Sequence, residues 1–120
     1  MRIHHIALRT TNVAALLGFY REVLGLPLRE RRPNGSIWLA AGDAILMLEV
    51  AAPGEPGINA GSMEFFSFRI AKEQRTSFLE KLQGAGVALE AESDFTLYFR
   101  DPDGRRIGVS HFPDAVRTQS

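Results

Sequence analysis

The side chains that could do chemistry in this 120-residue chain include three histidines and fourteen acidic groups. Two arginines, Arg9 in HIALRT and Arg69 in FFSFRI, lie in similar short segments. His5 could act as an acid or a base, because the pKa of an unperturbed imidazole lies near neutrality. Arg9 and Arg69 could bind a carboxylate or phosphate, since a guanidinium offers a planar fork of donors. The chain has no cysteine, which excludes disulfides, thiolate zinc sites and cysteine nucleophiles. It also contains no Ser/His/Asp triad, phosphate-binding loop or dinucleotide-binding glycine motif.

The charge balance and the hydropathy of the chain limit the classes of protein it can be. Fourteen basic and fourteen acidic side chains give a formal net charge of 0, which argues against nucleic-acid binding. No apolar run approaches the roughly 18 residues that cross a bilayer, and the first residues lack the apolar core of a signal peptide. We therefore expect a cytoplasmic, single-domain protein with neither a nucleic acid nor a membrane as its partner.

The apolar pattern predicts the same order of elements twice. Asn12 is a suitable N-cap for a helix whose apolar stripe runs from Val13 to Leu24. Around this helix we expect strands at 2–9, 27–32, 36–41 and 44–50, and around a second helix at 72–83 we expect strands at 63–70, 87–91, 95–100 and 105–111. The local sequence repeats as well, because HIALRT at 5–10 aligns with FFSFRI at 65–70.

This repeat predicts an α+β fold made of two tandem βαβββ units, each with a helix packed on a small, curved mixed sheet. Residues 1–50 would form the first unit, the Pro- and Gly-rich residues 51–62 a linker, residues 63–112 the second unit and residues 113–120 a tail. Together they would make one domain over 1–120.

Three phrases, HHIALR, FYREVLGLPL and DPDGRRIGV, occur in this order over residues 2–111. With them, the chain resembles the vicinal oxygen chelate superfamily, which includes glyoxalase I, bleomycin-resistance proteins and extradiol dioxygenases. The resemblance implies that the two units enclose a ligand cavity, and that the chain forms a homodimer. The same fold serves lyases, epimerases, dioxygenases, thiol transferases and drug-binding proteins, so the fold alone does not fix the function.

The resemblance also identifies positions where metal enzymes of this superfamily hold a divalent cation. His5 matches the first of four ligand positions. The other three positions hold Phe65, Met47 and Gly108, which are not metal ligands. Glu49 lies two residues beyond Met47 on the same strand face and is the one candidate substitute. Because a catalytic metal normally has about three protein ligands, we expect an incomplete metal site. No cofactor is then expected, and the alternative is a divalent metal held by His5 and Glu49.

Other residues are expected to line the cavity. The spacing from His5 to Arg9 resembles that of glyoxalase I, whose arginine helps to hold the carboxylate of glutathione, and Arg69 is its counterpart in the second unit. Either arginine could instead be a surface residue paired with a carboxylate. An apolar and aromatic lining with few polar groups, typical of small-molecule pockets, would come from Phe65, Ser67, Met47, Trp38 and Tyr98. Each of these could also serve ordinary packing.

Three functions stay open at this point. The incomplete metal site favours a protein that binds a small organic ligand, anionic or aromatic, in its cavity. The first alternative is a metal-dependent lyase, epimerase or dioxygenase related to lactoylglutathione lyase. The second is a metal-free enzyme that uses His5 as its base. His111, near the chain end, is expected to be solvated rather than part of any site.

Overall fold

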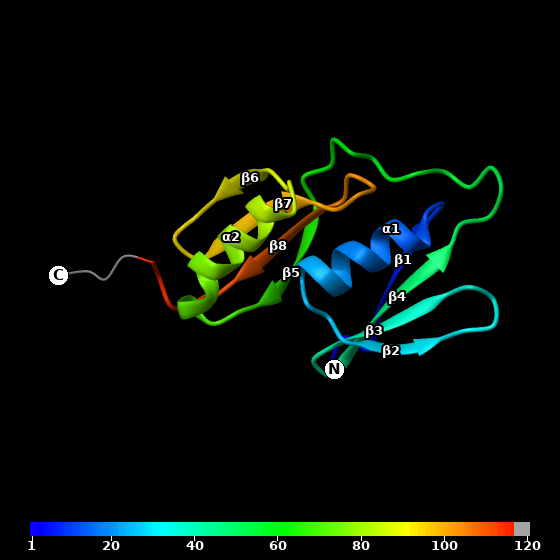
Figure 1. Ribbon diagram of the computed structural model, residues 1–120, viewed down its shortest axis with the longest axis horizontal. Coiled ribbons are helices and arrows are strands. Elements are labelled where there is room, and N and C mark those ends of the chain that lie inside the picture. The colour runs from blue at the N-terminus through cyan, green and yellow to red at the C-terminus, as the bar shows by residue number, and fades with distance from the viewer. Residues whose placement is uncertain (117–120) are drawn as a thin grey trace. The chain divides into compact units, whose positions relative to one another are not determined.

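The chain folds as two units, each with one four-stranded mixed sheet and one α-helix (Figure 1). The computed structural model describes residues 1–116, and the first unit is Met1–Ile58 while the second begins at Asn59. The first unit contains β1 (His5–Thr10), α1 (Val13–Gly18), β2 (Leu28–Arg31), β3 (Ile37–Ala41) and β4 (Ala44–Val50). The second contains β5 (Phe65–Arg69), α2 (Arg75–Gly84), β6 (Leu89–Glu92), β7 (Thr96–Arg100) and β8 (Arg106–Ser110).

The helix of the first unit starts where the sequence predicts. The side chain of Asn12 accepts a hydrogen bond from the backbone N–H of Ala15 at 3.1 Å, which satisfies one of the free donors of the first turn. Beyond α1 the helix continues as a π-helical turn over Phe19–Val23. The chain then turns at Gly25, whose φ of 78° lies in the left-handed region that glycine adopts without strain.

The two sheets repeat each other in strand order and register. Their orders are β1-β4-β3-β2 and β5-β8-β7-β6, with the first pair of each sheet parallel and the other pairs antiparallel. Both sheets even carry a register shift at the same place, Leu28 to Glu30 in β2 and Leu89 to Ala91 in β6. The tandem βαβββ fold is therefore confirmed, and Arg29 and Glu90 are the two residues that occupy the shift.

Alternation along the strands separates a core face from a second face in each sheet. In β1, Leu8 and Thr10 are buried, whereas His5 and Arg9 are exposed. The core faces carry the buried apolar side chains of the sheets: Leu8, Ile37, Leu39, Leu46 and Leu48 in the first unit, and Leu97, Phe99, Ile107 and Val109 in the second. We call the opposite face of each sheet its site face, because the candidate functional residues lie there.

Some boundaries and one burial class differ from expectation. The first strand begins at His5 rather than at residue 2, because its pairing with β4 begins at His5 and Ile45, and before it only the His4 carbonyl accepts a hydrogen bond from Ile45. The prediction that His111 is solvated is wrong, since only 2% of it is exposed. The Nε2 of His111 is 3.0 Å from a guanidinium nitrogen of Arg75, so the first residue of α2 contacts the histidine that follows β8.

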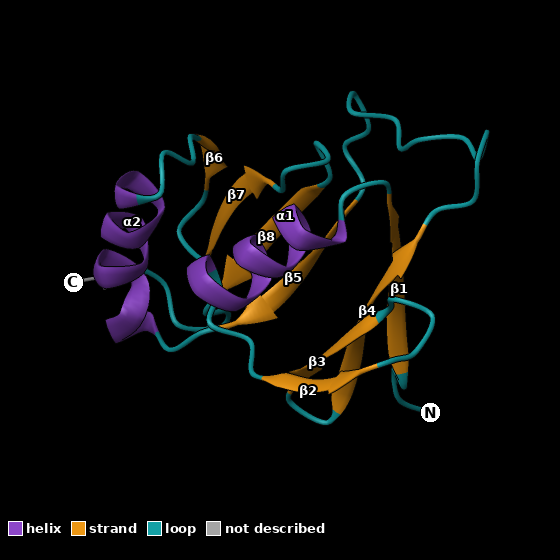
Figure 2. Cartoon of the chain, turned by 45° about the vertical axis from the view of Figure 1, so that its right-hand side comes forward, coloured by secondary structure: helices purple, strands orange, loops and turns teal. Residues whose placement is uncertain are grey.

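A long connection joins β4 to β5 without regular structure over residues 51–64 (Figure 2). Its first part is nevertheless fixed, because Glu55 accepts hydrogen bonds from the backbone of Ala52 and from the side chain of Arg9. Among residues 1–116, no helix is long and apolar enough to span a bilayer.

Candidate functional site

On the site face of the first sheet, His5 and Glu49 lie at different ends. His5 pairs with Ile45 across β1 and β4, while Glu49 pairs with Arg9. At about 3.3 Å per residue, four positions along a strand separate them by about 13 Å. The register therefore does not bring these two predicted metal ligands together.

His5 itself is exposed, and its closest polar neighbour is another histidine. The Nδ1 atoms of His4 and His5 lie 2.8 Å apart, so one ring donates to the other. This contact orients the His5 ring and leaves its Nε2 for solvent or a ligand.

Arg9 is held by two carboxylates. Its Nε and one terminal nitrogen donate to the two oxygens of Glu55, at 3.0 and 2.7 Å, and the other terminal nitrogen lies 3.7 Å from Glu49. The side-chain hydrogen bond from Arg9, supported by the backbone N–H of Ala52, lowers the pKa of Glu55 from an ordinary 4.5 to about 2. In the first unit, the arginine predicted to bind a ligand is therefore already paired, as the surface alternative expects.

Arg69, its counterpart in the second unit, has different neighbours. It pairs in register with Ser110 instead of a glutamate. One of its two terminal nitrogens lies 3.5 Å from the Phe112 carbonyl oxygen. It borders a hollow of about 370 Å³ where β5 and β8 end, lined by Ser67, Phe68, Arg69, Ser110, Phe112 and Pro113.

An aromatic and cationic cluster occupies the other end of the second site face. The rings of Phe65 and Tyr98 meet edge to face with centroids 4.9 Å apart. The guanidinium of Arg106 lies 4.3 Å from the Tyr98 centroid and 5.3 Å from that of Phe65. Only 9% of the Arg106 side chain is exposed, and its Nε is buried with no hydrogen-bond partner. Cation–π contacts with the two rings hold the charge in place.

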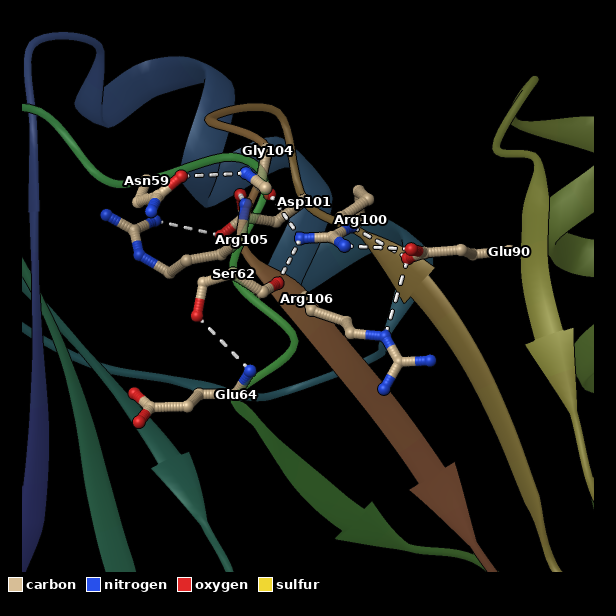
Figure 3. Close-up of polar contacts among 10 residues, drawn as sticks. Asn59, Ser62, Glu64, Glu90, Arg100, Asp101, Gly104, Arg105 and Arg106 are labelled. Carbon is tan, nitrogen blue, oxygen red and sulfur yellow. Dashed lines mark hydrogen bonds and ion pairs between the residues drawn. The ribbon is translucent and has the colours of Figure 1, made fainter.

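Glu90 and Arg100 support Arg106 from the side (Figure 3). Arg100 donates to both oxygens of Glu90, at 2.7 and 2.8 Å, and with its third nitrogen to the carbonyls of Ser62 and Gly104. Glu90 lies 3.6 Å from the Arg106 Nε. The hydrogen bonds from Arg100 are the main reason why the pKa of Glu90 lies below its ordinary value. Because Arg100 already engages both oxygens, the cluster keeps one net positive charge.

The turn before β8 positions this strand. Asp101 is buried and accepts hydrogen bonds from the backbone N–H groups of Asp103 and Arg105, and it also pairs with the Arg105 side chain at 2.9 Å. Gly104 completes the turn with a φ of 88°. The acidic turn motif is thus structural, and it presents Arg106 and Gly108 to the site face.

Gly108 lies in a tight place. A Cβ added there would be 3.0 Å from the Leu97 carbonyl oxygen and 3.2 Å from a methyl group of Thr96. A carboxylate side chain at this position therefore needs the strands to shift. Together with Phe65, which is packed against Tyr98, this means that the second unit offers no metal ligand at either expected position.

The remaining predicted residues lie on the site faces as well. Trp38 and Tyr98 occupy equivalent positions, opposite Met47 and Gly108 respectively, and both are half-buried. The Arg32 guanidinium lies 5.0 Å from the centroid of the Trp38 ring. The Nε1 of Trp38 is buried with no hydrogen-bond partner. Ser67 is exposed and pairs with Gly108.

Sequence reasoning missed Arg106 and Glu55. Arg106 has the same strand parity as Gly108, two residues away, so alternation could have placed it on the site face. No comparable signal exists for Glu55, which lies 46 residues from Arg9 in an irregular segment.

The donors present do not fit a catalytic metal. Within residues 1–116, no group of three or more histidine, aspartate or glutamate side chains could hold an ion. The geometry gives the reasons, since His5 is apart from Glu49, Phe65 is packed into an aromatic cluster, and a side chain at Gly108 would crowd its neighbours.

Two repeated βαβββ units with polar and aromatic groups on one face of each sheet place the chain in the class of tandem βαβββ folds. The sequence profile of the Glyoxalase/Bleomycin resistance protein/Dioxygenase superfamily matches residues 2–109. The chain belongs to this superfamily.

Known relatives differ in activity. The glutathione transferase FosA of Serratia marcescens is 25% identical over 114 residues, covering 88% of this chain and 77% of the relative. The lactoylglutathione lyase of Agrobacterium tumefaciens matches with a TM-score of 0.71 at 22% identity, over 91% of this chain and 92% of that one. A mutant of the fosfomycin resistance protein FosX of Listeria monocytogenes, complexed with Mn(II) and 1S,2S-dihydroxypropylphosphonic acid, matches with a TM-score of 0.76 at 13% identity, over 92% and 89%. At such identities the solved structures show the fold only.

Proposed function

We propose that this protein binds a small organic molecule on the site face of its second sheet and needs no metal to do so. The observation that carries the proposal is the Arg106 guanidinium, packed on Tyr98 and Phe65 where the superfamily places a metal ligand. A fixed cation between aromatic rings already supplies the positive charge and the apolar wall that small-molecule pockets combine.

The weak pairing of Arg106 within the protein supports this proposal. Its Nε is buried without a hydrogen bond, and the nearest acceptor is Glu90 at the ion-pair distance of 3.6 Å. Leaving a buried donor without a hydrogen bond costs about 1–3 kcal/mol, so native proteins rarely do it without a reason.

The test is binding with and without metal. Chelator-treated protein is screened by thermal shift against benzoate, phenylphosphonate, benzylamine and benzyl alcohol, then loaded with Mn²⁺, Ni²⁺ or Zn²⁺ and desalted. We expect at least one probe to bind the chelated protein, and elemental analysis to find less than stoichiometric metal. A stoichiometric ion, binding that needs the ion, or no binding by any probe would overturn the proposal.

A variant pair locates the binding on the second sheet. Arg106→Gln removes the charge and keeps a polar side chain, and we expect it to weaken the binding of the probe found. Arg29→Gln removes the same charge from an exposed position of β2 and should leave binding unchanged. Equal binding by both variants would place the ligand elsewhere.

A metal-free enzyme is the second candidate, and the His4–His5 contact favours it. With its Nδ1 engaged at 2.8 Å, His5 can present Nε2 as a base to an incoming substrate. Its relatives FosA and lactoylglutathione lyase are enzymes by name, which makes turnover worth measuring. Turnover that is unchanged in His5→Ala would dismiss this candidate.

Three further expectations stay predictions. They are the division of one domain into units at 1–50 and 63–112, the homodimer and the cytoplasmic location. Sedimentation of the full chain tests the homodimer directly, and a mass of one chain at micromolar concentration would contradict it.

A further inference from the structure

We propose that His111 is an acid-sensitive latch, which holds the segment after β8 against the start of α2 and releases it when the imidazole is protonated. We call residues 111–116 the end segment. The inference goes beyond the proposed function, because His111 follows the end of β8, whereas Arg106 stands at its start. Only 2% of His111 is exposed, and the proposed function does not use it.

The first observation is the tautomer that the contacts of the His111 ring require. Its Nε2 lies 3.0 Å from a guanidinium nitrogen of Arg75. A guanidinium has donors only, so this Nε2 must accept and carries no proton. The Nδ1 contacts the backbone carbonyl oxygen of Asp114, which can only accept, so the proton is on Nδ1. His111 is therefore neutral in this arrangement, and both ring nitrogens are engaged.

The second observation is what a proton on Nε2 would do. An imidazolium N–H would then face a guanidinium N–H at 3.0 Å, so a hydrogen bond becomes a repulsion between two cations. Water screens this repulsion little, because 2% of His111 and 12% of the Arg75 side chain are exposed. Arg75 is also held in place, since its second terminal nitrogen donates to the Ser93 carbonyl at 3.0 Å. Protonation therefore breaks the contact between the two side chains.

The charged groups around the ring do not offset the added charge. Glu92 of β6 is engaged with Arg75, at 3.6 Å from the nitrogen that also bonds Ser93. Asp114 meets the ring through its backbone carbonyl, which the Nδ1 proton already uses. From β5, Arg69 brings a second positive charge to the end segment, 3.5 Å from the Phe112 carbonyl. The side chain that touches Nε2 is thus a cation, with a further cation nearby.

The third observation is how the end segment is held. Its backbone hydrogen bonds run from His111 to Phe95 at 2.8 Å, from Asp114 to His111 at 2.9 Å and from Val116 to Asp94 at 2.8 Å. The Phe112 ring meets that of Phe95 edge to face, with centroids 5.0 Å apart, but 65% of Phe112 is exposed. Of the side chains in the end segment, His111 alone is buried. Loss of its contact with α2 should therefore loosen the whole segment.

The end segment also forms part of the hollow where β5 and β8 end. Phe112 and Pro113 line this hollow together with residues of the two strands. Release of the segment would move this part of the lining away. The latch would then connect the pH of the surroundings to the shape of the hollow.

The test follows the opening of the end segment in the ¹⁵N-labelled full chain at pH 7.5 and pH 5.5. Long-range ¹H–¹⁵N spectra of the imidazoles report the tautomer, and amide hydrogen exchange reports the opening. Exchange is expressed as protection factors, which remove the direct effect of pH on the exchange rate. We expect the Nδ1–H tautomer for His111 at pH 7.5.

The expected loss of protection follows from the linkage of one proton to the opening. A solvated imidazole has a pKa near 6.5, so a ring that titrates only when released favours the open form about tenfold more at pH 5.5 than at pH 7.5. Protection at the amides of His111, Asp114 and Val116 should fall by about this factor. The amides of Ile107 and Val109, inside β8, should keep theirs because the opening is local.

Three variants separate the cause. His111→Gln can accept and donate but does not titrate, so its end segment should be equally protected at both pH values. Arg75→Gln keeps a donor for the ring without the positive charge, and the loss of protection in acid should shrink. His4→Gln removes an exposed histidine of the first unit and is the matched control, which should behave like the natural protein. The amide spectrum of each variant checks that the fold is intact.

Several outcomes would overturn the inference. A proton on Nε2 of His111 at pH 7.5 would contradict the tautomer on which it depends. Equal protection of the end segment at both pH values in the natural protein would show that the latch does not open. A loss that is unchanged in His111→Gln or in Arg75→Gln would assign the pH dependence to other groups. A loss that extends to Ile107 and Val109 would mean unfolding of the sheet rather than release of the end segment.

Discussion

The two units have the same strands, the same register and the same bulge, but their site faces carry opposite charge. Arg9 and Arg69 occupy equivalent positions, yet Arg9 pairs with Glu49 in register and Arg69 with Ser110. This exchange of a carboxylate for a hydroxyl is one of the differences between the surroundings of the two guanidinium groups. Duplicated folds can thus keep their backbone while the two copies take different tasks.

The connection after β4 increases this difference. It brings Glu55 to Arg9, so that the first arginine has a bidentate carboxylate within its own unit. Arg9 and Arg32 then stand against Glu30, Glu49 and Glu55 on the first site face, a net negative charge. The second face has a positive excess, with three arginines against Glu90.

The largest effect is expected from restoring carboxylates at the two equivalent metal positions. Gly108→Glu should destabilise the protein by about 1–3 kcal/mol, because even the Cβ would crowd the Leu97 carbonyl at 3.0 Å. Met47→Glu should cost less, since the side chain it replaces is large and only half-buried. Urea unfolding at neutral pH measures both.

Gly108→Ala separates the two causes in that experiment. It adds the crowded Cβ without a charge, so it should account for part of the loss in Gly108→Glu. A Gly108→Glu variant as stable as the natural protein would show that β7 and β8 shift easily, and the steric reason for the missing ligand would be wrong.

The next prediction concerns binding. It replaces Ser110, the register partner of Arg69. Ser110→Glu gives the second unit the arrangement of the first, in which a carboxylate lies 3.7 Å from the arginine. We expect benzoate affinity to fall about tenfold, because the guanidinium is paired internally. Ser110→Ala removes only the hydroxyl and should reduce affinity less. Undiminished benzoate binding by Ser110→Glu would mean that Arg69 does not contact the carboxylate of benzoate.

Much of the fold could be predicted from the sequence, because its signals are local. Alternation indicated the faces of β1 and β5, and Asn12 marked the start of the first helix. Strand ends were less accurate, since they depend on where the neighbouring strand begins.

The candidate site was predictable only in part. Parity placed Phe65, Ser67 and Arg69 on one face, and the burial pattern of β5 agrees. Strand parity could not distinguish the partners of Arg9 from those of Arg69, because the difference comes from Glu55, which is distant in sequence and lies in a loop. His111 was misjudged for a similar reason, since its burial depends on Arg75 from α2. Partners from irregular or distant segments leave no periodic signal.

The smallest effect is expected from removing the Glu55 carboxylate, which pairs with Arg9 in the first unit. Arg9 lowers the pKa of Glu55 to about 2 from an ordinary 4.5, so the pair stabilises the folded state when Glu55 is ionised. This contribution is fully present above the unfolded pKa and is lost as pH falls through the folded one. We expect the stability gap between the natural protein and Glu55→Gln to be constant above about pH 5 and to close as the pH approaches 2.

Thermal unfolding at a series of pH values measures this gap. Glu80→Gln, on an exposed position of α2, is the matched control and should show a smaller gap that changes less with pH. Because the pair is partly exposed, added salt should narrow the Glu55 gap at neutral pH. A Glu55 gap that is equally wide at pH 3 and pH 7 would mean that Arg9 does not depend on this carboxylate, and the contrast between the two arginines would then rest on Glu49 and Ser110 alone.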